Sequence, residues 1–269
     1  MTRIRLLVSD IDGTLVRSDK TLSDAVVAAT RDVLDAGIAM TLISARPPSG
    51  MIWIAERLGL EGALGAFNGG TIFRSDGTIM AANRLDPELA GDALERLDKP
   101  GVTSWLYADG RWFAQTSDNP HVPSEIKSAG VDPVICADFS HLLARVDKLV
   151  GVSDDYELLA KINMEVARAF AGDATVAQSQ PYYLDITAPR ANKGDGLRAL
   201  ADSYGAALEE TAALGDQNND LPMFAIAGLT VAMGQASATV KAAAMHISQP
   251  NDDDGVADAI KRFILPANR

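Results

Sequence analysis

The chain has 269 residues, of which 47% are hydrophobic and 22% are charged, and its formal net charge is −12. This composition is typical of a globular protein with one large domain or two of ordinary size. The acidic balance argues against a nucleic-acid-binding surface, and the single cysteine, Cys136, excludes an internal disulfide. No apolar stretch is long enough to span a membrane and no secretory signal is visible, so we expect a cytoplasmic protein without membrane or nucleic-acid partners.

The first part of the chain alternates between predicted strands and helices. An apolar run at Leu6–Val8 predicts a buried strand that ends in two aspartates. Ser23 is a predicted helix cap, because a serine oxygen can accept a hydrogen bond from the first turn. The following elements are expected at 24–36 (helix), 38–43 (strand), 49–58 (helix) and 63–67 (strand). This alternation is typical of right-handed βαβ units in a parallel sheet.

The middle of the chain has a different pattern. A hairpin at 71–80 turns at Ser75–Gly77, and short helices and strands are then mixed, at 86–97, 102–107, 111–115, 154–170, 175–178 and 182–187. The βα alternation resumes at Lys193, with elements expected at 194–204, 211–214, 221–227, 230–232, 236–244, 245–248 and 255–263. The sequence therefore predicts an α/β core of residues 1–81 and 188–269, with an α/β domain inserted at 82–187.

Polar clusters follow several of the predicted core strands. They are Asp10 with Asp12, Ser44 with Arg46, Lys193 on the loop after the insertion, and Asp216 with Asn219 and Asp220. Each cluster alone has an ordinary structural explanation, such as a helix cap or a solvated charge. In a parallel sheet, however, the carboxyl ends of the strands meet at one edge, where open α/β sheets bind ligands. The clusters together therefore predict a site.

The residue types in these clusters suit phosphoryl transfer. One aspartate can attack phosphorus, and a second carboxyl group can protonate the leaving oxygen and then activate water. Carboxylates near Asp10 and Asp216 are hard oxygen ligands suited to Mg²⁺. Lys193 can stabilise charge on the phosphate oxygens, and Ser44 with backbone N–H groups near Asn68–Gly69 can hold the others.

The motifs resemble those of the haloacid dehalogenase superfamily. The resemblance rests on Asp10-Ile11-Asp12-Gly13-Thr14-Leu15, Ser44-Ala45-Arg46, Lys193 and Gly215-Asp216-Gln217-Asn218-Asn219-Asp220. Asn68-Gly69-Gly70, Val231-Ala232-Met233-Gly234 and Asp254-Gly255-Val256-Ala257 also resemble the Cof-type (type IIB) sugar-phosphatase branch. The resemblance implies a Rossmann-like core and an inserted α/β cap of the C2 type. It also implies a Mg²⁺-dependent phosphatase that acts on a small phosphorylated metabolite through an aspartyl-phosphate.

The resemblance also implies a role for each matching residue. Asp10 is the expected nucleophile, Asp12 the general acid/base, and Lys193 a bridge between nucleophile and phosphate. The expected metal ligands are Asp10, Asp216 and the backbone carbonyl of Asp12, and Asp220 is expected to orient Lys193 or a metal-bound water. Phosphate or substrate contacts are expected from Ser44, Ala45, Arg46, Asn68, Gly69 and Asn219.

Two positions depart from the family pattern, Gln235 and Gly70. Neither is expected to touch the chemistry, but both can alter the substrate side of the pocket. The acidic run Asp252–Asp254 could form a second metal site, but the preferred interpretation is a solvated loop that caps the last helix.

Two other activities stay open from the sequence. A phosphomutase or phosphotransferase would use the same motifs, although the seventeen acidic and nine basic residues between Arg84 and Asp185 disfavour a second phosphate site there. A phosphoacceptor without enzymatic activity also uses strand-end carboxylates and a lysine, but needs neither Asp12 nor so large an insertion. The sequence does not distinguish a monomer from a dimer.

Overall fold

A computed structural model describes residues 3–268, which form two compact units. The first unit contains the chain up to residue 45, residues 51–80 and the chain from residue 192 onward. The second contains residues 46–50 and 81–191. Within residues 3–268, no helix combines the length and the apolar character needed to cross a membrane.

The first unit is built on a parallel sheet of five strands in the order β14-β13-β12-β1-β2. The strands are β1 (Leu6–Ser9), β2 (Ala39–Leu42), β12 (Thr211–Gly215), β13 (Leu229–Ala232) and β14 (His246–Ile247). The chain leaves β1 for β2 on one side and returns through β12 on the other. The carboxyl ends of β1 and β12 thus flank a topological switch point, where such sheets bind ligands.

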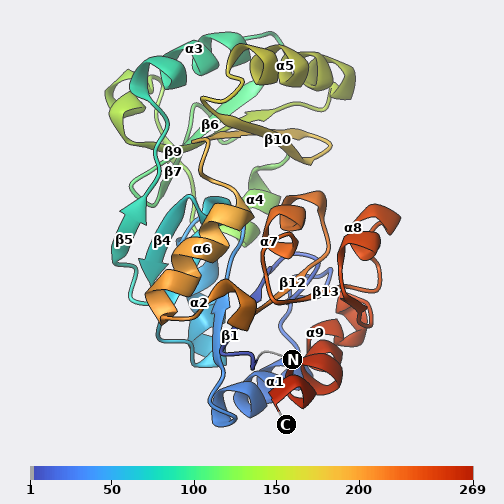
Figure 1. Ribbon diagram of the computed structural model, residues 1–269. Helices are drawn as coiled ribbons and strands as arrows, with labels where there is room; N and C mark the ends of the chain where they lie inside the picture. The colour runs from blue at the N-terminus through green and yellow to red at the C-terminus, as the bar shows by residue number, and fades with distance from the viewer. Residues whose placement is uncertain (1–2, 269) are drawn as a thin grey trace. The chain divides into compact units, whose positions relative to one another are not determined.

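Helices cover this sheet, as its apolar strands require. They are α1 (Asp24–Asp35), α2 (Ser49–Leu58), α6 (Lys193–Tyr204), α7 (Leu221–Phe224), α8 (Ala238–Ala243) and α9 (Gly255–Ala259), and α9 continues as a π-helical turn at Ile260–Ile264. Leu6 and Val8 of β1 pack in one core with Leu197 and Leu200 of α6. α1 packs against α9 (Figure 1). The predicted α/β class with a parallel, Rossmann-like sheet is confirmed.

Local signals in the sequence explain where two of these helices begin. The Ser23 hydroxyl oxygen accepts a hydrogen bond from the Val26 N–H at 3.2 Å, so the predicted cap of α1 is confirmed. The Asn192 side-chain oxygen accepts hydrogen bonds from the N–H groups of Gly194 and Asp195, at 3.1 and 3.0 Å. This cap starts α6 at Lys193 and so places the lysine in the first turn of the helix.

A small antiparallel sheet accompanies the core. Its strands are β3 (Ala63–Ala66), β4 (Thr71–Arg74) and β5 (Ile79–Ala82), in the order β3-β4-β5. A short 3₁₀ turn, Phe67–Gly69, joins the first two strands. The turn between β4 and β5 is closed by the Gly77 N–H, which donates to the Arg74 carbonyl at 2.8 Å, as the predicted hairpin requires.

The second unit has a mostly antiparallel sheet in the order β10-β11-β9-β6-β7-β8. Its strands are β6 (Thr103–Ala108), β7 (Arg111–Ala114), β8 (Val134–Ile135), β9 (Val146–Val152), β10 (Thr175–Gln180) and β11 (Tyr183–Thr187). Its helices are α3 (Pro87–Leu97), α4 (Val122–Ala129) and α5 (Tyr156–Ala169). α3 and α5 cover one face of the sheet, where Leu106, Leu149 and Leu184 pack against them (Figure 1).

The sequence did not predict α4, β8 or the central strand β9 individually. Two adjacent charged residues, Asp147 and Lys148, interrupt the apolar pattern of β9, yet both side chains are buried. The Asp147 carboxylate lies 3.4 Å from Arg84 Nε, and Lys148 Nζ lies 3.7 Å from an Asp185 carboxylate oxygen. Partners distant in the sequence thus offset part of the cost of these buried charges, which a local pattern does not reveal.

Candidate active site

The chain makes a tight turn directly after β1. The backbone N–H of Asp10 donates to the Leu214 carbonyl of β12 at 3.0 Å, which continues the sheet to the first aspartate. The Ile11 carbonyl then accepts hydrogen bonds from the N–H groups of Thr14, Leu15 and Val16, at 3.3, 2.9 and 3.0 Å. Three donors on one carbonyl fold the segment back on itself. The turn keeps the Asp10 side chain at the sheet edge.

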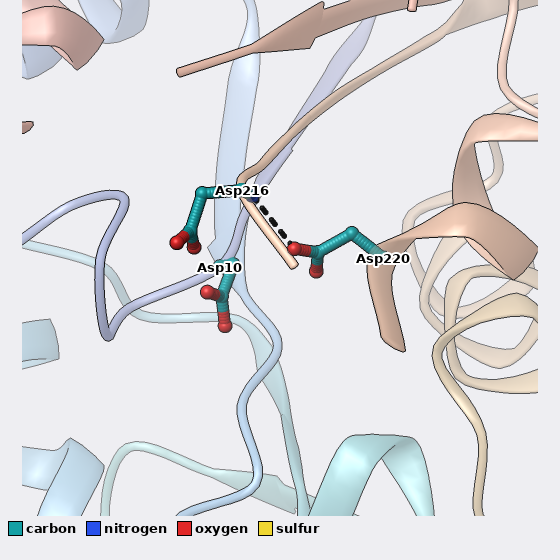
Figure 2. Close-up of side chains that lie close together, drawn as sticks. All are labelled: Asp10, Asp216 and Asp220. Carbon is teal, nitrogen blue, oxygen red and sulfur yellow. Dashed lines mark hydrogen bonds between the residues drawn. The ribbon is translucent and has the colours of Figure 1, made fainter. Parts of the chain in front are cut away.

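Three carboxylates converge at this edge, as Figure 2 shows. One carboxylate oxygen from each of Asp10, Asp216 and Asp220 lies within 4.8 Å of the others, and all three residues are buried. Lys193 Nζ donates to Asp10 Oδ1 and to Asp220 Oδ1, each at 2.6 Å, and its side chain is only 1% exposed. The lysine therefore ties the end of β1 to the segment after β12.

Both carboxylates that follow β12 are held by hydrogen bonds. Asp216 accepts from the Thr14 hydroxyl and from the Gln217 side-chain amide, each at 3.0 Å. Asp220 Oδ2 accepts from the backbone N–H groups of Asp216 and Gln217, at 2.7 and 2.8 Å, and the first of these bonds is the dashed line in Figure 2. Because Lys193 occupies its other oxygen, Asp220 is fully engaged as a support for its neighbours.

Burial and crowding shift the pKa values in this cluster. Burial raises the pKa of Asp10 to about 8 against the attraction of Lys193, and the Asp220 and Asp216 carboxylates add to the rise. Burial and the charge of Asp220 also raise the pKa of Asp216. Burial alone would lower the pKa of Lys193, but the attraction of Asp10 and Asp220 outweighs it and the pKa lies above its ordinary value. Lys193 is therefore cationic.

The chemistry of this donor set fits a divalent cation. Three carboxylates face one ammonium group, which leaves negative charge uncompensated when all three are ionised. Carboxylate oxygens are hard ligands, and Mg²⁺ is commonly bound through one or two carboxylates together with substrate oxygens. The Lys193 ammonium and two backbone N–H groups hold Asp220, whereas two neutral side chains, those of Thr14 and Gln217, hold Asp216. Asp10 and Asp216 are therefore the carboxylates that would hold the ion. The predicted contribution of the Asp12 carbonyl stays a prediction.

Ser44, Ala45 and Arg46 follow β2, the strand next to β1. The Ser44 N–H donates to the Gly65 carbonyl at 2.9 Å, and the Ser44 carbonyl accepts from the Asn68 N–H at 2.7 Å. Ser44 is buried and Ala45 is partly buried. Arg46 is also buried, and its guanidinium donates to the Gly50 carbonyl at 3.1 Å within the 46–50 segment, which groups with the second unit.

The 67–69 turn brings two further predicted residues together. Asn68 has a left-handed backbone conformation (φ 59°), and its side-chain oxygen accepts a hydrogen bond from the Asn219 amide at 3.2 Å. Gly69 approaches α6 so closely that a Cβ there would lie 2.4 Å from the Cα of Gly196. Only glycine allows this contact, which seats the turn against the helix that carries Lys193.

Asp12 lies outside the buried triad. Its Oδ1 accepts a hydrogen bond from Lys20 Nζ at 2.7 Å, in a pair whose side chains are 34% and 41% exposed. Sequence reasoning missed Lys20, because its loop carries no recognisable motif.

It also missed the contact of Gln235, whose amide donates to the Gly13 carbonyl at 2.5 Å. Gln235 was expected to affect the substrate side of the pocket and not the chemistry, but it contacts the residue that directly follows Asp12.

Comparisons with known proteins identify the family. A sequence profile of the haloacid dehalogenase-like hydrolases matches residues 7–260. The chain belongs to this family. A haloacid dehalogenase-like hydrolase from Bacteroides thetaiotaomicron is 31% identical, with a TM-score of 0.88 over 97% of this chain and 100% of that one. The phosphatase YwpJ of Bacillus subtilis is 27% identical over 97% of this chain and 100% of its own length.

The fold of this chain also matches that of a solved sugar phosphatase of subclass IIB. The two chains are 24% identical, with a TM-score of 0.82 over 96% of this chain and 98% of that one. That match confirms the predicted fold of a Rossmann-like core with an inserted cap. The family profile and the 31%-identical structure confirm the predicted superfamily with its Cof-type branch, and the predicted enzyme class, a hydrolase.

Proposed function

We propose that this haloacid dehalogenase-like hydrolase is a Mg²⁺-dependent phosphatase that hydrolyses a small phosphorylated metabolite through an aspartyl-phosphate on Asp10. The observation that carries the proposal is the contact of Lys193 Nζ with both Asp10 and Asp220, beside Asp216. This arrangement presents a fixed carboxylate, a fixed cation and hard oxygen ligands at one sheet edge. YwpJ is named a phosphatase and the subclass IIB structure is named a sugar phosphatase, which supports phosphate-ester hydrolysis as the reaction.

In the first step, the Asp10 carboxylate attacks phosphorus and the bond from phosphorus to the ester oxygen breaks. Asp12 donates a proton to that oxygen as it leaves. In the second step, Asp12 takes a proton from water while the water oxygen attacks the aspartyl-phosphate, which releases phosphate and restores Asp10. Because Asp12 lies outside the buried triad and is partly exposed, it can exchange its proton with solvent between turnovers.

Fixed charge supplies most of the acceleration that this reaction requires. Uncatalysed phosphomonoester hydrolysis is slow enough to need accelerations of up to ~10²¹, whereas acid–base catalysis by one group contributes about 10²–10⁴. Lys193 is held in place by two carboxylates and therefore needs no reorganisation when charge develops on the phosphate. A Mg²⁺ ion on Asp10 and Asp216 would reduce the repulsion between the carboxylates and the phosphate dianion.

The remaining predicted residues would hold the substrate. Ser44 stands at the strand end beside β1, and the Asn68–Asn219 pair offers amide groups at the same sheet edge. Asn219 belongs to the segment that carries Asp216 and Asp220. We assign phosphate contacts to these residues, and we assign selection of the leaving group to the domain inserted at 82–187.

The proposal is tested by release of inorganic phosphate from p-nitrophenyl phosphate and a panel of sugar phosphates, with Mg²⁺ and with chelator. We expect Mg²⁺-dependent release that Asp10→Asn abolishes. Asp76→Asn is the matched control, because Asp76 is exposed at the tip of the β4–β5 turn. Full activity in Asp10→Asn, or no release by the wild-type enzyme from any ester of the panel, would refute the proposal.

Trapping the intermediate separates the proposed phosphatase from the two other activities. We expect a transient phospho-Asp10 that forms and decays within the turnover time. A phosphotransferase would pass the phosphoryl group to an added sugar acceptor more often than to water. A phosphoacceptor without enzymatic activity would accumulate phospho-Asp10 and release no phosphate.

A further inference from the structure

A lysine outside the family motifs contacts the proposed general acid. Lys20 Nζ lies 2.7 Å from Asp12 Oδ1, a distance typical of a charge-assisted hydrogen bond. Lys20 has a left-handed backbone conformation, with φ at 71°. This region is uncommon for residues with a side chain other than asparagine or aspartate. The strain is therefore located at the residue that reaches the catalytic carboxyl group.

Hydrogen bonds within its own segment hold Lys20 in this conformation. The Lys20 N–H donates to the Arg17 carbonyl at 2.8 Å, and the Arg17 N–H donates to the Thr21 carbonyl at 2.9 Å. Asp19 accepts from the backbone N–H and the hydroxyl of Thr21, at 2.9 and 2.5 Å. These bonds close residues 17–21 into a compact loop, which we call the Lys20 loop.

The C-terminal part of the chain anchors the Lys20 loop. Asp252 accepts from the Ser18 N–H and hydroxyl at 2.8 and 2.7 Å, and Asp254 pairs with Arg17 at 3.0 Å. The prediction that the run Asp252–Asp254 caps the last helix is wrong, because Asp254 at the start of α9 makes no side-chain cap hydrogen bond. The carboxylates of this run instead fix the start of the Lys20 loop from a segment distant in the sequence.

A second set of contacts fixes the chain between Asp12 and this loop. The Asn251 side chain donates to the Val16 carbonyl at 3.0 Å, and the Gln235 amide donates to the Gly13 carbonyl. The Asn251 N–H in turn donates to the Gln235 side-chain oxygen at 3.1 Å. Asp12 and Lys20 are therefore held by one connected network, which fixes both ends of the bond between them.

We propose that Lys20 is a positioning residue for Asp12, which holds its carboxyl group in place for proton transfer to the leaving oxygen. The inference rests on the proposed function, because it gives Asp12 the role of general acid. A partly exposed ion pair contributes little to stability, so a strained and externally anchored lysine is poorly explained by folding. Fixing one carboxyl oxygen restricts rotation of the group, so the carboxyl group keeps one orientation during proton transfer.

Lys20 also borders an open groove of about 640 Å³, so ligand binding is an alternative role for this lysine. The groove is lined by Lys20, Thr21, Leu22, Trp53, Glu56 and Arg57. If Lys20 served to bind a ligand in this groove, its removal would weaken substrate binding and leave the chemical step unchanged. The two roles therefore differ in what happens at saturating substrate.

The test compares two esters that differ in their need for a general acid. The nitrophenolate of p-nitrophenyl phosphate leaves without a proton, whereas the alkoxide of a sugar phosphate needs one. The rate of phosphoryl transfer to Asp10 is measured in single turnovers at saturating substrate, with the sugar phosphate that the wild-type enzyme hydrolyses fastest. We expect Lys20→Met to slow phosphoryl transfer from the sugar phosphate about 10- to 100-fold. Its effect on phosphoryl transfer from p-nitrophenyl phosphate should be about tenfold smaller.

Two further variants separate the ammonium group from the backbone. Lys20→Arg retains a cation and should recover most of the lost rate. Lys20→Asn suits the left-handed conformation but lacks the cation, so it should be as slow as Lys20→Met. Thermal midpoints of all three variants should stay close to that of the wild type.

Equal slowing of both esters by Lys20→Met, or slowing of neither, would overturn the inference. A raised KM with unchanged single-turnover rates would do the same and would assign Lys20 to the groove. These results differ from a failure of the proposed function, in which the wild-type enzyme itself would hydrolyse neither ester and both proposals would fall.

Discussion

Gly13 and Asp216 are fitted to each other so closely that position 13 has no room for a side chain. A Cβ at Gly13 would lie 2.4 Å from Asp216 Oδ2, although the two residues are distant in the sequence. Gly13 also has a φ of 77°, which glycine adopts without strain. The glycine after Asp12 thus shapes the turn and leaves the Asp216 carboxylate in place.

Gly13→Ala should therefore lower the rate of phosphate release by more than its loss of stability explains. We expect phosphate release to fall by at least about 100-fold, because a 1 Å displacement of a catalytic group costs that much. Gly37→Ala is the matched control. Gly37 has a φ of 76°, and within residues 3–268 only its chain neighbours come within 4 Å of the place that a Cβ would take. Both variants carry the backbone strain of about 1–2 kcal/mol, so similar losses of activity in the two would contradict the role given to Gly13.

Lys193→Met should both inactivate and destabilise the enzyme. The substitution leaves Asp10 and Asp220 buried without their counter-charge, which typically costs about 3–5 kcal/mol. Part of this cost would be avoided by protonation of Asp10, whose pKa is already about 8. The free energy of unfolding in urea measures the loss, and Lys161→Met, at an exposed position of α5, is the control. Wild-type stability in Lys193→Met would contradict the buried-network assignment.

The sequence predicted that the main site residues converge, because the carboxyl ends of neighbouring parallel strands lie at the same edge of a sheet. Once β1 and β12 are neighbours, residues just beyond their ends, such as Asp10 and Asp216, must lie close together. Lys193 was placed on the loop before a helix expected at 194–204, whereas the Asn192 cap, which was not predicted, starts α6 at Lys193 itself. Their catalytic roles stay predictions.

The supports of Asp12 could not be predicted in this way. Lys20 reaches Asp12 from a loop whose shape depends on Asp252, a residue near the end of the chain. Asn251 and Gln235 act through backbone carbonyls, which have no side-chain signature in the sequence. The buried charges of β9 hid a central strand for a related reason, because their partners are also distant.

Asp216→Asn should remove the response of the protein to Mg²⁺ without weakening the metal-free fold. In the wild type, Mg²⁺ that binds only the folded state raises the thermal midpoint as its concentration rises. The raised pKa of Asp216, due to burial and to Asp220, shows that its charge is unfavourable there. The asparagine variant should therefore be at least as stable as the wild type in chelator, and its midpoint should not change in a Mg²⁺ titration. A Mg²⁺ shift equal to that of the wild type would exclude Asp216 as a ligand.

Asp147→Asn should stabilise the second unit at neutral pH and lose that advantage in acid. Burial raises the pKa of Asp147 above the usual 3.8 despite the attraction of Arg84, so the folded state favours the protonated form. The stability contributed by that proton is present below pH 3.8 and is lost as the pH rises through the folded-state pKa. Asparagine stays neutral, so its thermal midpoint should exceed that of the wild type at pH 7 and approach it toward pH 4. Asp138→Asn should behave oppositely, because hydrogen bonds from Ser140 lower the pKa of Asp138. A gain for Asp147→Asn that does not depend on pH would show that lost charge is not its cause.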